Sequence, residues 1–324
     1  MSQQLHFGVT PWRSLNAGAD QATARALTQQ ASKAETLGYE SFWLPESHFT
    51  GAAAIPDPLM SLASVAGATE RIRLATTSYL LPLRHPIQAA EQVAVLDRLS
   101  EGRVLLGVGR GFQNSLFQAF DVDAKEKRSR FEACLLRMQD AWKGEALGQD
   151  LGSDVVLAPQ PVQRPHPPIW AAAFGPRAIE QAARLGLPYL ASPVETLEHL
   201  KENYCQYREW CAQNNSKVPD TVPVMRTVFL SSDAGEIARV EAVLKEQMKL
   251  LQGRGTQAVA RAGAAQVSDW ALLGDRDQIR QQIARYRREL GMTHLIITRL
   301  RVNSLPGDML EENIERIAEL LGQC

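Results

Sequence analysis

Short apolar segments that resemble buried strands alternate with helical segments along the whole chain. Eight strands are predicted, each followed by a helix: 5–10, 39–44, 72–79, 103–108, 168–173, 188–192, 222–230 and 293–300. Short apolar runs bounded by turn residues are typical of strands that are buried on both faces of a parallel sheet. Eight strands in strict alternation with helices favour a closed (β/α)8 barrel over an open sheet. The sequence therefore predicts an α/β protein, a TIM barrel formed by a single domain over residues 1–324.

Two segments interrupt this alternation. Residues 144–167 are rich in Gly, Pro and Gln, and residues 252–271 contain three glycines without a clear period. We expect both to be excursions from the barrel. A loop as long as the second is usually functional or disordered, so it is a candidate lid over a site.

The helices predicted at 56–69 and 87–99 are apolar or small on more than one side. Such a helix must be covered on more than one side. The sheet would provide one cover. The other could be the rest of this chain or a partner subunit, and the residues alone leave both alternatives open.

Composition and charge exclude several classes of protein. Apolar residues are 45% of the chain, charged residues are 22%, and the net charge is −1, so nothing favours a nucleic-acid or membrane partner. Four cysteines without CxxC spacing and six histidines predict no metal site. The start of the chain does not resemble a signal peptide, and no run approaches the ~18 apolar residues of a membrane helix. We therefore expect a cytoplasmic protein.

Polar residues follow several of the predicted strands. In a TIM barrel, functional residues gather at the carboxyl ends of the strands. The candidates are Glu46, Ser47 and His48 after the second strand, Thr76, Thr77 and Ser78 at the end of the third, Arg110 after the fourth, Ala173 to Ala178 after the fifth and Ser192 after the sixth.

Two of these strand ends suit a phosphate. Arg110 lies between two glycines, which let a ligand approach the backbone, and arginine binds phosphate through a planar fork of donors. The turn Phe174-Gly175-Pro176-Arg177-Ala178 opens a helix, and Pro176 at its first position leaves N–H groups aimed at an anion. Such a Gly-Pro start is also a common plain cap. Because loops after neighbouring strands adjoin in a barrel, both features could hold one phosphate.

The segment Glu46-Ser47-His48 offers an acid, a hydroxyl and an imidazole. His48 could transfer protons because the pKa of histidine lies near neutrality, or it could be hydrogen-bonded for structure. Ser47 and His48 do not form a nucleophilic pair, since neighbouring residues of a strand point to opposite faces. The chain contains no GxSxG elbow, P-loop or GxGxxG motif.

At these residues the chain resembles the bacterial-luciferase-like flavin-dependent monooxygenases, over nearly its whole length. The most specific segment is LLPLRHPIQAAEQVAVLDRLSEGRVLLGVGRGF (80–112), with ESHFT at 46–50 and GLP at 186–188. The resemblance implies a barrel that binds FMN at its C-terminal mouth. Reduced FMN would react with O2 to give a C4a-peroxide that attacks a small organic substrate, while the protein positions the flavin and excludes water.

The resemblance also implies which residues hold FMN. Those for its phosphate would be Arg110, Phe174, Gly175, Arg177 and Ala178. Those for its isoalloxazine ring would be Thr76, Thr77 and Ser78, with Ser192 nearby. Members of the family often have a non-proline cis peptide at the end of the third strand, which would be Thr77–Ser78 here. The catalytic residues would be Glu46, Ser47 and His48.

The family further implies partners. A separate flavin reductase would supply the reduced FMN, and subunits would pair as a homodimer through the helices at 57–69 and 87–99. Residues 252–271 would be the lid over the flavin.

The chain also departs from the family. Luciferases carry a histidine, an expected general base, where this chain has Ser47, so light emission by the same route is not expected. Leu116 replaces a commonly acidic residue, and Pro193 stands where luciferases have an aromatic residue. Three arginines at later strand ends favour an anionic substrate or pair with local carboxylates: Arg226, Arg299 and Arg301. Deazaflavin-dependent hydride transfer on the same fold, and flavin binding without turnover, are the alternatives.

Overall fold

The structure, a computed structural model, describes residues 4–12, 22–51, 54–148, 154–252, 257–298 and 305–322. The chain divides into two compact units. Unit 1 comprises Met1–Ser14, Lys33–Phe42 and Ala173–Cys324, and unit 2 comprises Leu15–Ser32 and Trp43–Ala172. Strand β2 (Ser41–Leu44) and helix α1 (Ala22–Thr36) both cross the boundary between the units.

Unit 2 contains a parallel sheet built on a wholly buried central strand, β5 (Val104–Gly109). It pairs with β3 (Arg73–Thr76) on one side and with β6 (Ile169–Ala172) on the other. The short strand β4 (Tyr79–Leu80) also pairs with β5, so the strand predicted at 72–79 is in fact two. The buried rings of Trp43 and Trp170 pack 5.1 Å apart.

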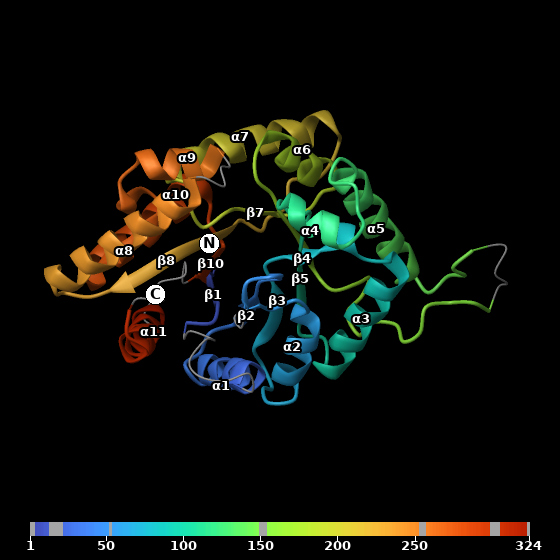
Figure 1. Ribbon diagram of the computed structural model, residues 1–324, viewed down its shortest axis with the longest axis horizontal. Coiled ribbons are helices and arrows are strands. Elements are labelled where there is room, and N and C mark those ends of the chain that lie inside the picture. The colour runs from blue at the N-terminus through green and yellow to red at the C-terminus, as the bar shows by residue number, and fades with distance from the viewer. Residues whose placement is uncertain are drawn as a thin grey trace. The chain divides into compact units, whose positions relative to one another are not determined.

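The helices of unit 2 begin and end where local chemistry predicts. They are α2 (Pro58–Ala66), the 3-10 turn η2 (Leu81–Leu83), α3 (Pro86–Leu99), α4 (Asn114–Ala119) and α5 (Lys127–Ala141). Asp57 caps α2 by accepting a hydrogen bond from the backbone N–H of Met60, and prolines start both α2 and α3. In Figure 1, α3 lies between α2 and α5 on the outside of the strands. Helix α4 has only six residues, which is too short to show a helical period in the sequence.

The end of the excursion predicted at 144–167 is hydrogen-bonded to α3. Asp97, a fully buried residue of α3, accepts hydrogen bonds from the backbone N–H of Gln163 (2.9 Å) and from its side-chain amide (2.7 Å). The same amide donates to the carbonyl oxygen of Val104, at the start of β5. These contacts fix the end of the excursion before the chain enters β6.

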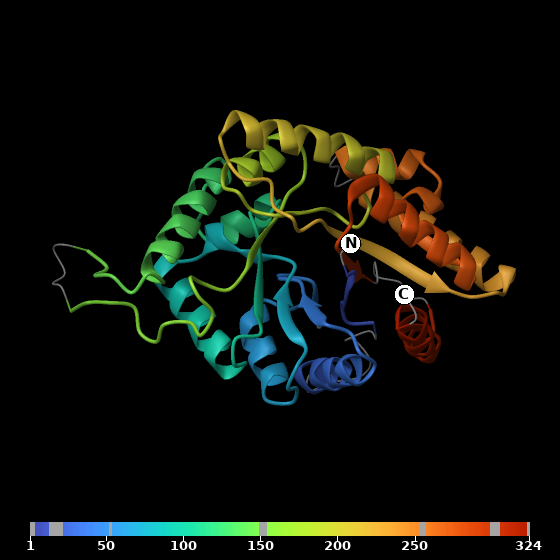
Figure 2. The same cartoon turned by 180° about the vertical axis from the view of Figure 1, so that it is seen from behind.

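Unit 1 contains the strands β1 (His6–Val9), β7 (Tyr189–Leu190), β8 (Pro223–Leu230), β9 (Ala271–Gly274) and β10 (His294–Ile297). β1, β10, β8 and β9 follow one another in a parallel sheet, with the first residues of β2 beside β1. The side chains of Val9, Val224 and Leu295 are fully buried. Figure 2 shows the long strand β8 with α11 on one side and α8 and α10 on the other.

The helices of unit 1 are α6 (Pro176–Arg184), α7 (Leu197–Gln213), α8 (Ala234–Gln252), α9 (Gln257–Ala264), α10 (Arg276–Leu290) and α11 (Gly307–Leu321), with the 3-10 turn η4 (Val267–Asp269). The prediction that 252–271 lacks regular structure is wrong, because α9, η4 and the start of β9 lie there. Helix α9 is only eight residues long, and the residues that it is seen to bury, Ala258 and Ala262, are small. Among the helices of the described ranges, none is long and apolar enough to cross a membrane.

Three tyrosines cluster around β7 and α7. The rings of Tyr189 and Tyr204 lie 5.2 Å apart, and the ring of Tyr207 lies 6.2 Å from that of Tyr204. The hydroxyl of Tyr204 donates to the carbonyl oxygen of Tyr189, and that of Tyr207 donates to the carbonyl oxygen of Leu187. Burial is the main cause that raises the pKa of all three phenols.

Candidate functional site

Glu46 follows β2, and its side chain is completely buried. Its carboxylate accepts two hydrogen bonds from the guanidinium of Arg84, at 3.1 and 3.0 Å, and one from the backbone N–H of Leu80 at 2.9 Å. His48 Nε2 lies 2.8 Å from Oε1 of the same carboxylate. The guanidinium of Arg84 also stacks on the ring of Tyr79, 3.9 Å from its centroid. Glu46 therefore ties the end of β2 to the segment that follows β3.

His48 is held in one orientation. A carboxylate can only accept hydrogen bonds, so Nε2 is the donor in this pair and Nδ1 is the ring nitrogen that lies outside it. The imidazole lies edge-on to the ring of Phe120, 5.1 Å away. Ser47 closes the following loop instead, because its hydroxyl accepts a hydrogen bond from the backbone N–H of Ile55 (3.0 Å) and its own N–H donates to the carbonyl oxygen of Ile55. The catalytic roles of Glu46, Ser47 and His48 stay predictions.

The end of β3 packs against β5. The hydroxyl of Thr76 donates to the carbonyl oxygen of Gly107 (2.8 Å), and the backbone N–H of Thr77 donates to the carbonyl oxygen of Leu44. The Thr77–Ser78 peptide bond is cis, as predicted. A Cβ at Gly109 would lie 2.1 Å from the hydroxyl oxygen of Ser78, so only glycine fits beside this strand end.

Arg110 is half-buried at the end of β5, and its guanidinium donates to the carbonyl oxygen of Ala172 at 3.2 Å. Burial, and then the charge of Arg128, lower the pKa of Arg110 to about 10. Burial, followed by the charges of Arg110 and Arg128, also lowers the pKa of Lys127. We call Arg110, Lys127 and Arg128 the cation cluster. These mutually unfavourable charges would be relieved by an anion, so the donor set fits a phosphate group.

The remaining predicted cofactor residues belong to unit 1. Gly175 has a φ of 81° and leads into α6, and the exposed Phe174 and Arg177 flank it. The backbone N–H of Ala178 donates to the carbonyl oxygen of Gly175. Ser192 is buried just after β7.

Sequence reasoning missed Glu195, a buried residue three positions after Ser192. Its carboxylate accepts a hydrogen bond from the backbone N–H of Ser192 at 2.6 Å, and burial raises its pKa to about 7. No sequence pattern marks Glu195, since only the fold shows that the neighbouring Tyr189, Ser192 and Asn203 direct their donors to its buried carboxylate. Arg226, which favoured an anionic substrate, is fully buried and donates to the carbonyl oxygens of Glu195 and Met225 and to the hydroxyl of Tyr286. It is therefore a structural residue, whereas Arg299 and Arg301 lie outside the described residues.

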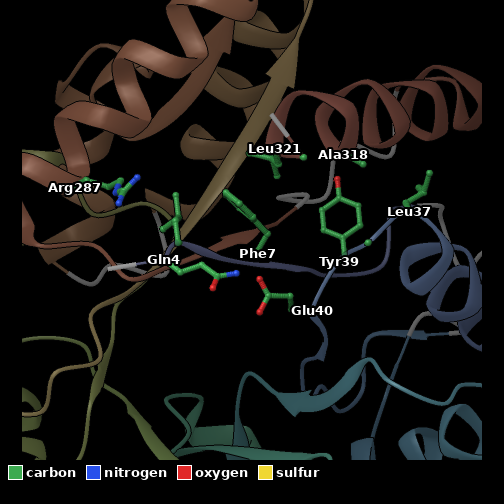
Figure 3. Close-up of a pocket in the computed structure, with 11 residues that line it drawn as sticks. Gln4, Phe7, Leu37, Tyr39, Glu40, Arg287, Ala318 and Leu321 are labelled. Carbon is green, nitrogen blue, oxygen red and sulfur yellow. The ribbon is translucent and has the colours of Figure 1, made fainter. Parts of the chain in front are cut away.

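A cavity of ≈ 410 Å³ lies at the opposite, amino-terminal ends of the unit 1 strands (Figure 3). Phe7, Tyr39, Glu40 and Arg287 are among its lining residues. Because TIM-barrel sites form at the carboxyl ends of the strands, this cavity is not the candidate site. In the described part of the chain, no group of three or more His, Cys, Asp or Glu residues could hold a metal ion.

A family profile described as luciferase-like monooxygenase matches residues 6–294, and the chain belongs to this family. It is 29% identical over 236 residues to the oxygenase component of a flavin-dependent trigonelline monooxygenase from Acinetobacter baylyi, an alignment that covers 69% of this chain and 65% of that protein. Alignments with the curated relatives span from half to about two thirds of the relatives' own lengths.

Solved structures confirm the predicted fold class, a TIM-barrel-type α/β fold. One is the oxygenating constituent of 3,6-diketocamphane monooxygenase from Pseudomonas putida in complex with FMN, with a TM-score of 0.78, 19% identity and 98% of each chain covered. Another is an F420-dependent secondary alcohol dehydrogenase in complex with an F420-acetone adduct, with a TM-score of 0.73, 15% identity and 99% of each chain covered.

Proposed function

We propose that this protein is the oxygenase component of an FMN-dependent monooxygenase. It would accept reduced FMN from a separate flavin reductase in the cytoplasm and use O2 to oxygenate a small organic substrate. The observation that carries this proposal is the half-buried cation cluster at the end of β5, beside the Thr77–Ser78 strand end, in a chain of the luciferase-like family.

When bound, reduced FMN would supply the activated oxygen. The cation cluster would hold its phosphate through Arg110. Phe174, Gly175, Arg177 and Ala178, at the start of α6, would contribute further phosphate contacts. The end of β3, from Thr76 to Ser78, would lie against the isoalloxazine ring, with Ser192 as a further contact. His48, oriented by Glu46, would hold or move a proton at Nδ1.

We also propose that the whole chain works as one barrel domain and that two copies pair through the helices predicted at 57–69 and 87–99. In the described part of these helices, large apolar side chains are exposed: Met60 (74%), Leu99 (57%) and Val95 (42%). A second copy would remove this apolar surface from water. Residues 252–271, which include α9, would cover the bound flavin.

Deazaflavin-dependent hydride transfer is the second candidate function. It is favoured by the structural similarity to an F420-dependent dehydrogenase. The two functions differ in one observable, since only the monooxygenase consumes O2. A flavin-binding protein without turnover would bind FMN but oxygenate nothing, and Ser47 at the position of the luciferase base favours this outcome.

The test is an anaerobic titration with FMN, reduced FMN and reduced deazaflavin, followed by rapid mixing with O2. Tight binding of reduced FMN and flavin reoxidation slower than that of free reduced FMN would support the proposal. Preferential binding of the deazaflavin would contradict it. Reoxidation at the rate of free flavin would leave only a flavin-binding role.

Arg110→Ala tests the phosphate contact. We expect FMN to bind about 10- to 100-fold more weakly, because a charge-assisted hydrogen bond to phosphate is lost. Riboflavin, which lacks the phosphate, should bind the variant and the wild type alike. Arg71→Ala, at an exposed position of the same unit, is the matched control. Unchanged FMN affinity in Arg110→Ala would remove the phosphate role.

A further inference from the structure

The turn after β7 is held by two buried charged residues. Ser192, Pro193, Val194 and Glu195 form this turn, which we call the Ser192 turn, and the backbone N–H of Glu195 donates to the carbonyl oxygen of Ser192. The guanidinium of Arg226 donates to the carbonyl oxygens of Pro193 (3.5 Å) and Glu195 (2.7 Å). The carboxylate of Glu195 folds back onto the backbone N–H of Ser192. The buried side chains of Glu195 and Arg226 therefore hold the backbone of the turn in one conformation.

The donors that contact the carboxylate of Glu195 are neutral. Oε1 accepts from the hydroxyl of Tyr189 (2.6 Å) and from the side-chain amide of Asn203 (2.8 Å), and Oε2 accepts from the backbone N–H of Ser192 (2.6 Å). Arg226 donates its hydrogen bonds to backbone carbonyl oxygens and to the hydroxyl of Tyr286. It therefore stabilises the carboxylate by its charge at a distance.

This arrangement suits an ionised carboxylate and conflicts with a protonated one. A proton on Oε2 would face the N–H of Ser192, so two donors would compete for the same space. A proton on Oε1 would have to be donated to the hydroxyl oxygen of Tyr189, whose own hydrogen would then need another acceptor. In both cases the N–H of Ser192 loses a charged acceptor, and hydrogen bonds to charged acceptors are roughly twice as strong as neutral ones.

We propose that Glu195 is a positioning residue for the cofactor: as a carboxylate it holds the Ser192 turn in the conformation that presents Ser192 to the flavin, and uptake of a proton releases the turn. The proposal rests on the proposed function, because Ser192 contacts the flavin only if the protein binds one. Affinity for the flavin therefore rises as pH increases through the titration of Glu195.

The groups that face Glu195 fix the direction of this dependence. Burial raises its pKa from 4.5 to about 7, whereas the hydrogen bonds from Tyr189, Ser192 and Asn203 and the charge of Arg226 lower it. The phenol of Tyr204 on α7 also interacts electrostatically with Glu195, but burial raises its own pKa so far that it stays neutral. Protonation of Glu195 thus falls within the working range of a cytoplasmic enzyme.

The test compares the flavin affinity of wild type and Glu195→Gln at a series of pH values from about 5.5 to 8.5. The ratio of the two dissociation constants cancels the titration of the flavin phosphate, which also ionises near pH 6. We expect the wild type to lose about fivefold in affinity on acidification relative to the variant. Tyr189→Phe removes a hydrogen bond that lowers the pKa, so the midpoint should move to higher pH while the dependence remains.

A second readout does not involve the flavin. The infrared band of a buried protonated carboxyl should disappear between pH 6 and pH 8 in the wild type and should be missing from Glu195→Gln. If the wild type binds flavin but the ratio of its dissociation constant to that of Glu195→Gln does not change with pH, this proposal is contradicted and the proposed function is not. A wild type that binds no flavin contradicts the proposed function, and the proposal with it.

Discussion

Each unit of the protein buries one carboxylate just beyond the carboxyl end of a strand, and the two are stabilised in different ways. Glu46 follows β2 and forms a two-bond ion pair with Arg84. Glu195 follows β7 and accepts hydrogen bonds from a phenol, an amide and a backbone N–H. Both side chains are removed from water, so burial alone does not distinguish them.

The difference lies in where the compensating arginine directs its donors. Arg84 binds the carboxylate itself, whereas Arg226 binds the backbone around Glu195. A charge-paired carboxylate is a fixed element of structure, because breaking the pair leaves an uncompensated buried charge. A carboxylate held by neutral donors can change its protonation state near neutral pH, and so can couple pH to the shape of a turn.

Removing the arginine of the first pair should have the largest effect. We expect Arg84→Met to reduce the free energy of unfolding by about 3–5 kcal/mol, because Glu46 would remain buried without its guanidinium. Urea denaturation measures this loss. Adding Glu46→Gln to Arg84→Met should restore part of the stability, and a double variant as unstable as the single one would argue against a charge effect.

The second prediction concerns pH and Glu195. Its folded pKa of about 7 lies above the value of 4.5 for an unperturbed carboxyl, so the folded state binds more protons than the unfolded state between these values. The free energy of unfolding of the wild type relative to Glu195→Gln should therefore fall as pH rises from about 5 to 8, by at most about 3 kcal/mol. Denaturation at each pH measures it, with Glu180→Gln at an exposed position of α6 as the control. A constant difference would show that Glu195 does not titrate in this window.

Tyr189→Phe should have a smaller effect. It removes one hydrogen bond to Glu195 and leaves the packing of the ring unchanged, so we expect a loss of about 0.5–1.5 kcal/mol at pH 8. At pH 6, where the carboxyl is protonated, the loss should be smaller. Equal losses at both pH values would mean that the phenol does not distinguish the two forms.

The exposed pair Glu70–Arg71 should show the least effect. Its charged atoms lie 4.0 Å apart and both side chains are largely exposed, so Arg71→Ala should change the free energy of unfolding by no more than about 0.5 kcal/mol. A loss close to that of Arg84→Met would contradict the view that burial decides the importance of a pair in this protein.

The sequence was sufficient to predict features that depend on local pattern. The alternation of apolar strands with helices indicated the α/β barrel class, and the segment at 80–112 indicated the luciferase-like family; both predictions are confirmed. The cis peptide at Thr77–Ser78, which the resemblance to that family implied, is also confirmed. Each of these depends on residues that are close together in the chain or on a period that can be counted.

Features that depend on how the fold orients and buries side chains were not predictable in the same way. Arg226 lies in an apolar strand, and only the fold shows that its donors are taken up by backbone carbonyls and by Tyr286. Glu195 lies close in the chain to Tyr189 and Asn203, but only the fold shows that these side chains turn toward its buried carboxylate. Helix α9 was missed because it is only eight residues long and the residues that it is seen to bury are alanines, which also occur commonly in loops.

The buried tyrosines give the protein an intrinsic optical reporter. Burial raises the pKa of Tyr79, Tyr189, Tyr204 and Tyr207 well above 10, so these phenols remain un-ionised while the protein is folded. Once the chain unfolds they would ionise in alkaline solution and absorb as tyrosinates. The loss of structure above pH 10 should therefore produce a tyrosinate absorbance step that coincides with unfolding, and no label would be needed to follow it.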